Sequence, residues 1–348
     1  MAPAEHIIAG LVPIRPVTPD AAPSPAEEGG SGLERLGRRL LVPLGLGLLV
    51  GVGLVLTASP RQLLASFRRF DLRLLPWVLA LSLVNYGLRF IRWEVYLHRL
   101  GVRLARSKSL AVFGVGFLLS VTPGKAGELG KGWLVRELGG GPALRVVPAV
   151  LAERVTDLLG VLLLLACGAP AFPRGIWLSA VLLAAVAAVL LLLAWKRGAE
   201  LVFRLAARLP VVGSKVHLVA DVFDRLRSLL TPGLLLVALV LSAIAWGAEG
   251  VGFWLVVREY APQASLLAAL FNYTGATVVG SLSMLPGGLG AAEGSMAALL
   301  HAQGLGTADA NLVTLVVRGA TLWFAVGLGL LALPFVARWL AASNKKKL

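Results

Sequence analysis

Residues 122–128 read TPGKAGE and residues 285–293 read LPGGLGAAE, each between apolar flanks. Proline removes a backbone donor and glycine permits a chain reversal, so each stretch predicts two short helices that meet at a turn. We therefore expect helical hairpins over about residues 108–140 and 264–304, with arms too short to span a bilayer comfortably. Lipid tolerates such re-entrant backbone only where it is buried in protein or faces a cavity.

The two turns are followed by the same pattern of residues. After each turn come a glycine and a glutamate, and an arginine lies 31 or 32 positions beyond the proline. The members are Pro123, Gly124, Glu128 and Arg154 in the first copy, and Pro286, Gly287, Glu293 and Arg318 in the second. The shared spacing predicts an internal repeat. The alternative is a chance coincidence of Pro-Gly turns and single charges in a glycine-rich membrane protein.

The composition predicts a membrane protein. Of 348 residues, 57% are hydrophobic and 15% are charged, with a mean hydropathy of +0.83. Soluble domains have ~45–50% apolar and ~25% charged residues, so a water-soluble globular protein is excluded. Six stretches approach the ~20 apolar residues of a helical span; they cover about residues 40–57, 74–97, 144–167, 176–195, 234–257 and 312–336. No segment alternates with a period of two, so we expect an all-α polytopic protein rather than a β-barrel.

The number of spans between the hairpins sets their relative orientation. Three predicted spans separate them, and an odd number of crossings places them on opposite faces of the membrane. The repeat is therefore predicted to be inverted. Inverted repeats with broken helices near the midplane are typical of transporters. The expected fold has about six spans and two opposed re-entrant hairpins.

Positive charge predicts the orientation of the chain. The formal net charge is +15, from 33 Lys and Arg against 18 Asp and Glu, which over membrane loops indicates contact with anionic lipid headgroups rather than nucleic acid. The positive-inside rule places residues 99–108, 196–231 and 345–347 in the cytoplasm, together with both termini. Segment 196–231 is also expected to form an amphipathic surface helix. The arginines that would face outward, on a predicted interfacial helix, are Arg61, Arg68, Arg69 and Arg73.

The ends of the chain differ in composition. Residues 1–32 hold six of the 19 prolines and too little apolar mass to offset the entropy of ordering the chain. We expect a disordered Pro-rich tail over 1–32 and a single transmembrane domain over 33–348.

Motifs for catalysis and cofactor binding are missing from the sequence. Cys167 is the single cysteine, and the four histidines lie far apart without metal-ligand spacing. No phosphate-binding loop of nucleotide hydrolases occurs, and the apolar portion has no Ser-His-Asp or Cys-His arrangement. We therefore expect no cofactor, no metal site and no catalytic residue.

Charged residues inside the predicted spans are the candidate site residues, because a charge at the bilayer centre is costly. Glu153 and Asp157 lie one turn apart on one face of the third span, and Arg154 points about 100° away. Substrate contact is one interpretation. The other is a buried ion pair that fixes helix packing, for example Arg154 with Glu128. Glu249 lies deep in its own span, and the sequence indicates no partner for it.

Two further groups of charges have alternative interpretations. Arg89 and Arg92 lie one turn apart, and their guanidinium groups suit forked hydrogen bonds to phosphate oxygens. The alternative is that both snorkel to the interface. Arg318, within the last span, and Glu293, just beyond the second turn, are expected to act as a functional pair.

The turns themselves predict an anion site. Half-helices that start after Gly124 and Gly287 would leave unpaired backbone N–H groups with partial positive charge, which bind phosphate or carboxylate. Lys125 and Lys131 would strengthen this site at the first turn.

Taken in order, these motifs resemble the flippase-like transmembrane region of lysylphosphatidylglycerol synthases and its stand-alone relatives. The matching pieces are residues 88–93 (LRFIRW), 122–128 (TPGKAGE), Glu153-Arg154 with Asp157, and 285–293 (LPGGLGAAE), and the likeness covers about residues 35–340. The resemblance implies movement of an aminoacylated or otherwise modified phospholipid between leaflets. Bifunctional members carry a soluble aminoacyl-transferase domain after the membrane region. This chain stops at Leu348, so we expect it not to make the lipid.

We expect a multi-pass protein of the inner or plasma membrane, whose hairpins line a polar cavity that accepts a lipid headgroup. The arginines at 89, 92, 154 and 318 would hold phosphate. The carboxylates at 128, 153, 157 and 293 would balance them or bind a cationic aminoacyl group. One alternative is a lipid-headgroup transferase with Glu153 or Asp157 as base. The other is a non-transporting protein that recruits a lipid biosynthetic enzyme through segment 196–231.

The expected partners are therefore membrane lipids. They are anionic or modified phospholipids or, by the resemblance to the stand-alone relatives, polyprenyl- or hopanoid-type lipids, with a lipid biosynthetic enzyme as a further partner. The glycines of the first span would suit a homodimer interface; they are Gly45, Gly47, Gly51 and Gly53.

Overall fold

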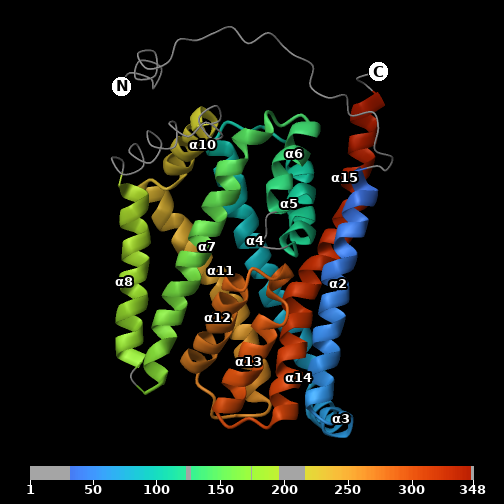
Figure 1. Cartoon of the computed structure of the whole chain (residues 1–348), viewed down its shortest axis with the longest axis vertical. Coiled ribbons are helices and arrows are strands. Elements are labelled where there is room, and N and C mark those ends of the chain that lie inside the picture. Colours follow the sequence, from blue (N-terminus) through green and yellow to red (C-terminus); the bar gives the residue numbers. More distant parts are fainter. Residues whose placement is uncertain (1–31, 123–126, 174, 196–215, 346–348) are drawn as a thin grey trace. The chain divides into compact units, whose positions relative to one another are not determined.

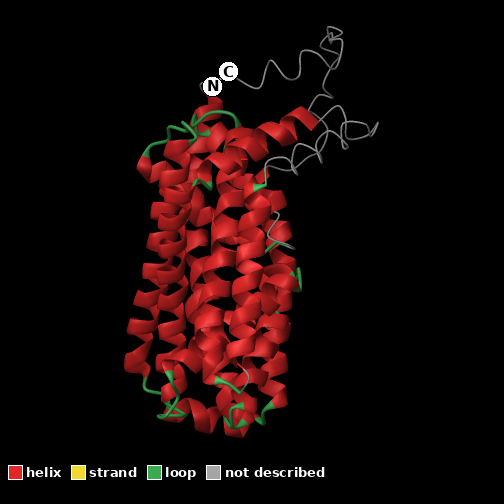
Figure 2. Cartoon of the chain, turned by 90° about the vertical axis from the view of Figure 1, so that its left-hand side faces the viewer, coloured by secondary structure: helices red, strands yellow, loops and turns green. Residues whose placement is uncertain are grey.

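The computed structural model describes residues 32–122, 127–173, 175–195 and 216–345. It divides into two units, Met1–Gly37 and Arg38–Leu348, and the fold described below is that of the second. Every regular element among the described residues is helical (Figure 2). The predicted all-α class is therefore confirmed. The predicted tail lies outside the described residues except for Gly32, which begins the first helix.

The helices fall into two halves along the chain (Figure 1). The first half holds α2 (Gly32–Thr57), α3 (Pro60–Arg69), α4 (Leu75–Arg99), α5 (Arg106–Ser120), α6 (Gly130–Glu137) and α7 (Val147–Gly168). The second half holds α8 (Gly175–Ala194), α10 (Val216–Leu229), α11 (Pro232–Arg258), α12 (Leu266–Leu282), α13 (Ala291–Ala302), α14 (Thr307–Arg318) and α15 (Phe324–Lys345). A π-helical turn, Gly319–Trp323, joins α14 to α15.

Within the described part of the chain, three helical segments are long and apolar enough to cross a membrane. They are Leu72–Arg99, Pro232–Arg258 and Thr307–Ser343. A fourth candidate is the pair Gly45–Thr57 and Pro60–Arg69, which is bent by 95°. The other predicted spans coincide with α7, which carries three charged residues, and with the apolar α8.

Two helical hairpins lie at opposite ends of the 38–348 unit (Figure 1). The first, α5 with α6, and the second, α12 with α13, both turn near the middle of the long helices. At 1.5 Å per residue, α6 is ~12 Å long and α13 ~18 Å, and neither matches a ~30 Å hydrocarbon core. The long helices between the hairpins are α7, α8 and α11, as predicted.

The two halves make equivalent contacts with each other. Helix α5 packs against α15, and its counterpart α12 packs against α7. Helix α3 packs against α14, its counterpart α10 packs against α7, and α4 packs against α11. Each half thus completes the packing of the other. The two larger hydrophobic cores of the described residues surround the hairpins: one includes Trp93 and Val135, and the other includes Phe253 and Val313. A third, small core contains Leu118, Val121 and Val326.

The arginine-rich segment after the first span forms helix α3, and its interfacial position stays a prediction. Helix α3 is held at its C-terminal end by Asp309, whose Oδ1 accepts hydrogen bonds from Arg69 and Ser66 at 2.5 Å each. The hydroxyl of Tyr260 donates to the Ser66 carbonyl at 3.0 Å. Burial, and then the nearby Asp309, raise the pKa of Tyr260 to about 12, so this hydroxyl stays protonated near neutral pH.

The predicted amphipathic segment 196–231 is described only in its second part. Residues 196–215 lie outside the described residues. Helix α10 follows, with an apolar face that buries Leu226 and Leu229 in the first core. The position of this segment at the membrane surface stays a prediction.

The second turn differs from the predicted start of a half-helix after Gly287. Pro286–Gly288 form a short 3-10 helix, and α13 begins only at Ala291. Three glycines, Gly287, Gly288 and Gly290, adopt positive φ angles of 62°, 68° and 85°, which permit this extra turn. Gly288 also lies against the α12 backbone, because a Cβ there would be 3.0 Å from the Gly280 Cα.

Replacing Gly288 by alanine should destabilise the second hairpin. The left-handed backbone costs a residue with a Cβ ~1–2 kcal/mol, and the contact with Gly280 adds to that cost. Gly294→Ala, on the exposed side of α13 with open space around it, is the matched control and should be neutral or stabilising, since alanine favours a helix over glycine by ~1 kcal/mol. Thermal unfolding of both variants in detergent measures this. Equal melting temperatures would contradict the assigned turn geometry.

Candidate functional site

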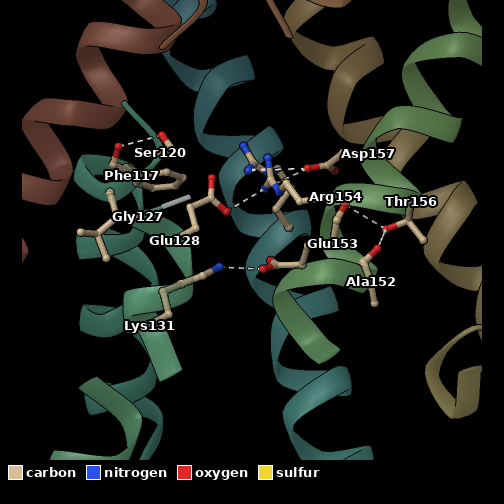
Figure 3. Close-up of polar contacts among 12 residues, drawn as sticks. Phe117, Ser120, Gly127, Glu128, Lys131, Ala152, Glu153, Arg154, Thr156 and Asp157 are labelled. Carbon is tan, nitrogen blue, oxygen red and sulfur yellow. Dashed lines mark hydrogen bonds and ion pairs between the residues drawn. The ribbon is translucent and has the colours of Figure 1, made fainter. Parts of the chain in front are cut away.

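Charged side chains from three elements meet beside the turn of the first hairpin (Figure 3). Helix α4 contributes Arg89 and Arg92, and α7 contributes three residues from one turn. The hairpin contributes two from the start of its second arm. The residues from α7 are Glu153, Arg154 and Asp157, and those from the hairpin are Glu128 and Lys131.

Asp157 is the centre of this cluster. Its Oδ1 accepts a hydrogen bond from Arg92 at 2.6 Å and one from the indole N–H of Trp246 at 3.2 Å. Its Oδ2 lies 3.2 Å from Arg154 and 3.7 Å from Arg89. One carboxylate therefore ties together α4, α7 and α11.

The predicted pair of Arg154 with Glu128 is confirmed. Arg154 Nη2 lies 3.3 Å from Glu128 Oε2, so the third long helix is tied to the hairpin turn. The Arg154 side chain is 25% exposed, whereas that of Glu128 is 3% exposed. Arg154 is thus the member of the pair whose side chain is partly accessible.

Arg89 and Arg92 do not snorkel. Their side chains are only 13% and 1% exposed. The guanidinium of Arg89 also lies over the rings of Phe117 and Trp246, at 5.9 and 5.7 Å from their centroids. The interfacial interpretation is wrong because Asp157, on a facing helix, supplies the counterion inside the protein.

Lys131 and Glu153 form a second, fully buried ion pair. Their Nζ and Oε2 atoms are 2.6 Å apart, and the side chains are 3% and 0% exposed. The ammonium of Lys131 also lies 4.4 Å from the centroid of the Trp93 ring. The prediction that Lys131 strengthens an anion site at the turn is therefore wrong, because Glu153 already compensates the charge of Lys131.

The second turn is held by the same kind of pair. Arg318 Nε donates to Glu293 Oε1 at 2.6 Å, and Arg318 Nη2 donates to the Gly287 carbonyl at 3.0 Å. The other oxygen of Glu293 accepts from the Gly290 N–H at 2.7 Å, at the start of α13. Arg318 and Glu293 thus form an ion pair, and their functional role stays a prediction. The predicted anion site on this helix N-terminus is corrected: the protein's own Glu293 carboxylate occupies it.

The first turn is described in part. Pro123, Gly124 and Lys125 lie outside the described residues. Residues 127–129 form a 3-10 turn before α6 begins at Gly130, and the Gly127 N–H donates to Thr122 Oγ1 at 2.8 Å. The prediction of an anion site on Lys125 thus stays a prediction.

A cavity of about 520 Å³ joins the two charged clusters. Its wall includes Arg89, Arg154 and Asp157 from the first half and Glu249 and Arg318 from the second. Most of the remaining wall is apolar, with Phe117, Val161, Leu282 and Leu285 among its residues. Neither Lys131 nor Glu153 reaches it. The cavity therefore offers three guanidinium groups and two carboxylates in an otherwise largely apolar space.

Glu249 has a partner that the sequence did not indicate. The hydroxyl of Tyr273, on α12, donates to Glu249 Oε2 at 2.5 Å. Both residues line the cavity. Glu249 and Tyr273 lie on different helices. The periodicity of one helix does not show which residue of another helix it faces, so no sequence pattern indicated this contact.

Among the described residues, no group of three His, Cys, Asp or Glu side chains is arranged to hold a metal ion. The family model of the lysylphosphatidylglycerol synthase transmembrane region matches residues 44–329. The chain belongs to this family. The match covers both hairpins and all of the charged residues of the cavity.

The chain is also similar to two proteins with curated descriptions. The chain is 24% identical over 303 residues to a UPF0104 membrane protein of Methanothermobacter thermautotrophicus strain Delta H, which covers 82% of this chain and 90% of that protein. A second UPF0104 membrane protein of the same organism is 28% identical over 95 residues, which is 27% of this chain and 28% of that protein. Both are described as membrane proteins, as the composition predicts for this chain.

The Lys131–Glu153 pair should contribute to stability and not to ligand binding. Lys131→Met leaves Glu153 buried without its counterion and should lower the free energy of unfolding by ~3–5 kcal/mol. Adding Glu153→Leu should recover most of that loss, because apolar replacement of a buried ion pair is often neutral.

Thermal unfolding in detergent, followed by tryptophan fluorescence, checks this result. Arg225→Ala, which breaks an exposed ion pair with Asp221 on α10, is the control and should cost less than ~1 kcal/mol. A double variant no more stable than Lys131→Met alone would argue against a purely structural role.

Proposed function

We propose that this protein moves the polar headgroup of a phospholipid, or of an aminoacyl- or glycolipid, between the two leaflets of a membrane. The observation that carries the proposal is the cavity between the hairpins, lined by Arg89, Arg154 and Arg318. Membership of the lysylphosphatidylglycerol synthase transmembrane family supports a lipid-related role.

The unused hydrogen-bonding capacity of the arginines supports a phosphate ligand. The Nε atoms of Arg89, Arg92 and Arg154 are buried and have no acceptor among the described residues. Guanidinium groups bind phosphate oxygens through two parallel hydrogen bonds. Arg154 presents the most exposed side chain of the three and lies on the cavity wall. It is the arginine best placed to reach a headgroup.

The size of the cavity favours a headgroup over a whole lipid. Its volume of about 520 Å³ is within the ~300–1,000 Å³ range of small-molecule pockets. A diacyl lipid needs more room, so its acyl chains would stay in the bilayer. As the headgroup passes, the charged groups of the cavity would contact water first from one side of the membrane and then from the other.

The proposed topology follows from the positions of the basic segments. The loop 99–106, helix α10 and the end of α15 lie at the same end of the unit as the base of the first hairpin (Figure 1). We place this end in the cytoplasm, with six spans, two re-entrant hairpins and both termini on the cytoplasmic side. The second hairpin then enters from the opposite face, and the halves form an inverted repeat in an inner or plasma membrane.

The transferase alternative has less support from the geometry. Glu153 is fully buried against Lys131 and does not line the cavity, and Asp157 accepts a 2.6 Å hydrogen bond from Arg92. Asp157 lines the cavity, but three guanidinium groups lie within 4 Å of its carboxylate and already compensate its charge. The recruitment alternative would depend on α10 and the basic segment before it, not on the cavity.

Transport is tested by leaflet exchange of fluorescent phosphatidylglycerol in phosphatidylcholine liposomes, read by quenching of the outer leaflet. Arg154→Ala should slow exchange by about ten- to a hundredfold, the factor for loss of charge-assisted hydrogen bonds worth ~1.5–3 kcal/mol. Arg154→Lys keeps the positive charge but cannot donate two parallel hydrogen bonds, so its exchange rate should lie between those of the unmodified protein and Arg154→Ala.

The matched control is Arg225→Ala on α10, outside the cavity, which should exchange lipid at the unmodified rate. Melting temperatures in detergent establish that each variant is folded. Equal rates in protein-free liposomes would refute transport. A new lipid species in the mass spectrum would favour the transferase, and a defect confined to the α10 variant in cells would favour recruitment.

A further inference from the structure

Glu249 is set apart from the other carboxylates of the site. It lies on α11, is 5% exposed and lines the cavity. Asp157, Glu128, Glu153 and Glu293 each form an ion pair, whereas Glu249 forms none among the described residues. Its hydrogen bond is with the Tyr273 hydroxyl, a neutral donor.

The groups that face Glu249 come from every helix packed around it. They are Tyr273 on α12, Tyr86 and Arg89 on α4, Asp157 on α7 and Arg318 on α14. The two arginines are engaged elsewhere, Arg318 with Glu293 at 2.6 Å and Arg89 with Asp157 at 3.7 Å. Glu249 therefore experiences positive charge from both halves without a dedicated counterion.

The charges of the two described clusters balance when Glu249 is ionised. We define the charge network as the ion-paired residues around the cavity together with Glu249. It contains five cations, Arg89, Arg92, Lys131, Arg154 and Arg318, and five carboxylates, Glu128, Glu153, Asp157, Glu249 and Glu293. Protonation of Glu249 would leave one positive charge uncompensated. A phosphodiester headgroup carries one negative charge and would restore the balance.

We propose that Glu249 is a proton-binding site, which takes up one proton when a phosphodiester headgroup occupies the cavity and releases it when the headgroup leaves. This inference rests on the proposed function. The proton passes from water to the Glu249 carboxylate, whose Oε2 stays bonded to Tyr273, and it returns to water on release. The carboxylate becomes a neutral acid, and no other bond forms or breaks.

The coupling has a simple electrostatic cause. In a poorly hydrated cavity an uncompensated charge is expensive, so the anion and the proton each make the other's binding more favourable. Linkage is reciprocal: if the lipid raises proton affinity, the proton raises lipid affinity by the same factor. A headgroup and a proton that cross together carry no net charge, and a pH gradient would then drive the lipid.

Proton uptake on lipid binding tests the inference directly. The purified protein in detergent is titrated with dioctanoyl phosphatidylglycerol in weak buffer, at neutral and mildly alkaline pH, with a pH indicator. We expect about one proton taken up per bound lipid. Glu249→Gln should bind the lipid with almost no proton uptake, because its neutral amide imitates the protonated acid. Glu259→Gln, at the exposed end of the same helix, should behave like the unmodified protein.

The affinity of the unmodified protein for the lipid, measured as a function of pH, gives a test that needs no variant. It should fall up to tenfold per unit of pH above the point where Glu249 ionises, and this dependence should be lost in Glu249→Gln. Glu249→Asp keeps a carboxylate and should keep proton uptake.

The outcomes separate this inference from the proposed function. Saturable lipid binding without proton uptake, and with an affinity independent of pH, would overturn the proton site and leave the lipid site standing. Proton uptake that persists in Glu249→Gln would assign the proton to another group and also overturn it. Absence of saturable binding by the unmodified protein at every pH would remove both.

Discussion

The cost of burying charge in an apolar environment shapes this structure. A guanidinium or carboxylate without a counterion would destabilise the folded chain by several kcal/mol. Asp157 meets this constraint for three arginines at once, two on α4 and one on its own helix. Because these helices are joined through one carboxylate, the ion pairs fix how α4, α7 and α11 meet, and the apolar cores on either side complete the packing.

The same solution occurs in both halves. In each, a glutamate just after the hairpin turn pairs with an arginine on the long helix that follows: Glu128 with Arg154, and Glu293 with Arg318. A hairpin too short to cross a membrane is thus tied to a helix that is long enough. The reciprocal packing of α5 on α15 and of α12 on α7 then brings the two turns toward one cavity.

The sequence predicted what depends on local pattern or on the repeat. The helical segments follow from apolar length. The two glutamate–arginine pairs were expected because a charge inside a membrane span needs a partner, the first of them only as an alternative to substrate contact. Burial of Arg89 and Arg92, the Lys131–Glu153 pair and the Glu249–Tyr273 contact were not predictable, since each depends on which helices face each other. The start of α13 was also missed. A carboxylate three residues inside the helix caps it at Gly290, and positive φ angles at three glycines permit the extra turn.

The ion pairs around the cavity differ in length. The pairs that do not involve a cavity-lining cation, Lys131–Glu153 and Arg92–Asp157, are both 2.6 Å long. Arg154, on the cavity wall, lies at 3.2 and 3.3 Å from its two carboxylates, whereas its counterpart Arg318 is 2.6 Å from Glu293. The two equivalent arginines therefore have different partners: Arg154 lies between two carboxylates, whereas Arg318 donates to the Glu293 carboxylate and to the Gly287 carbonyl. The buried Nε of Arg154 also has no acceptor among the described residues, so under the proposed function Arg154 is the member of the two pairs with hydrogen-bonding capacity left for a phosphate oxygen.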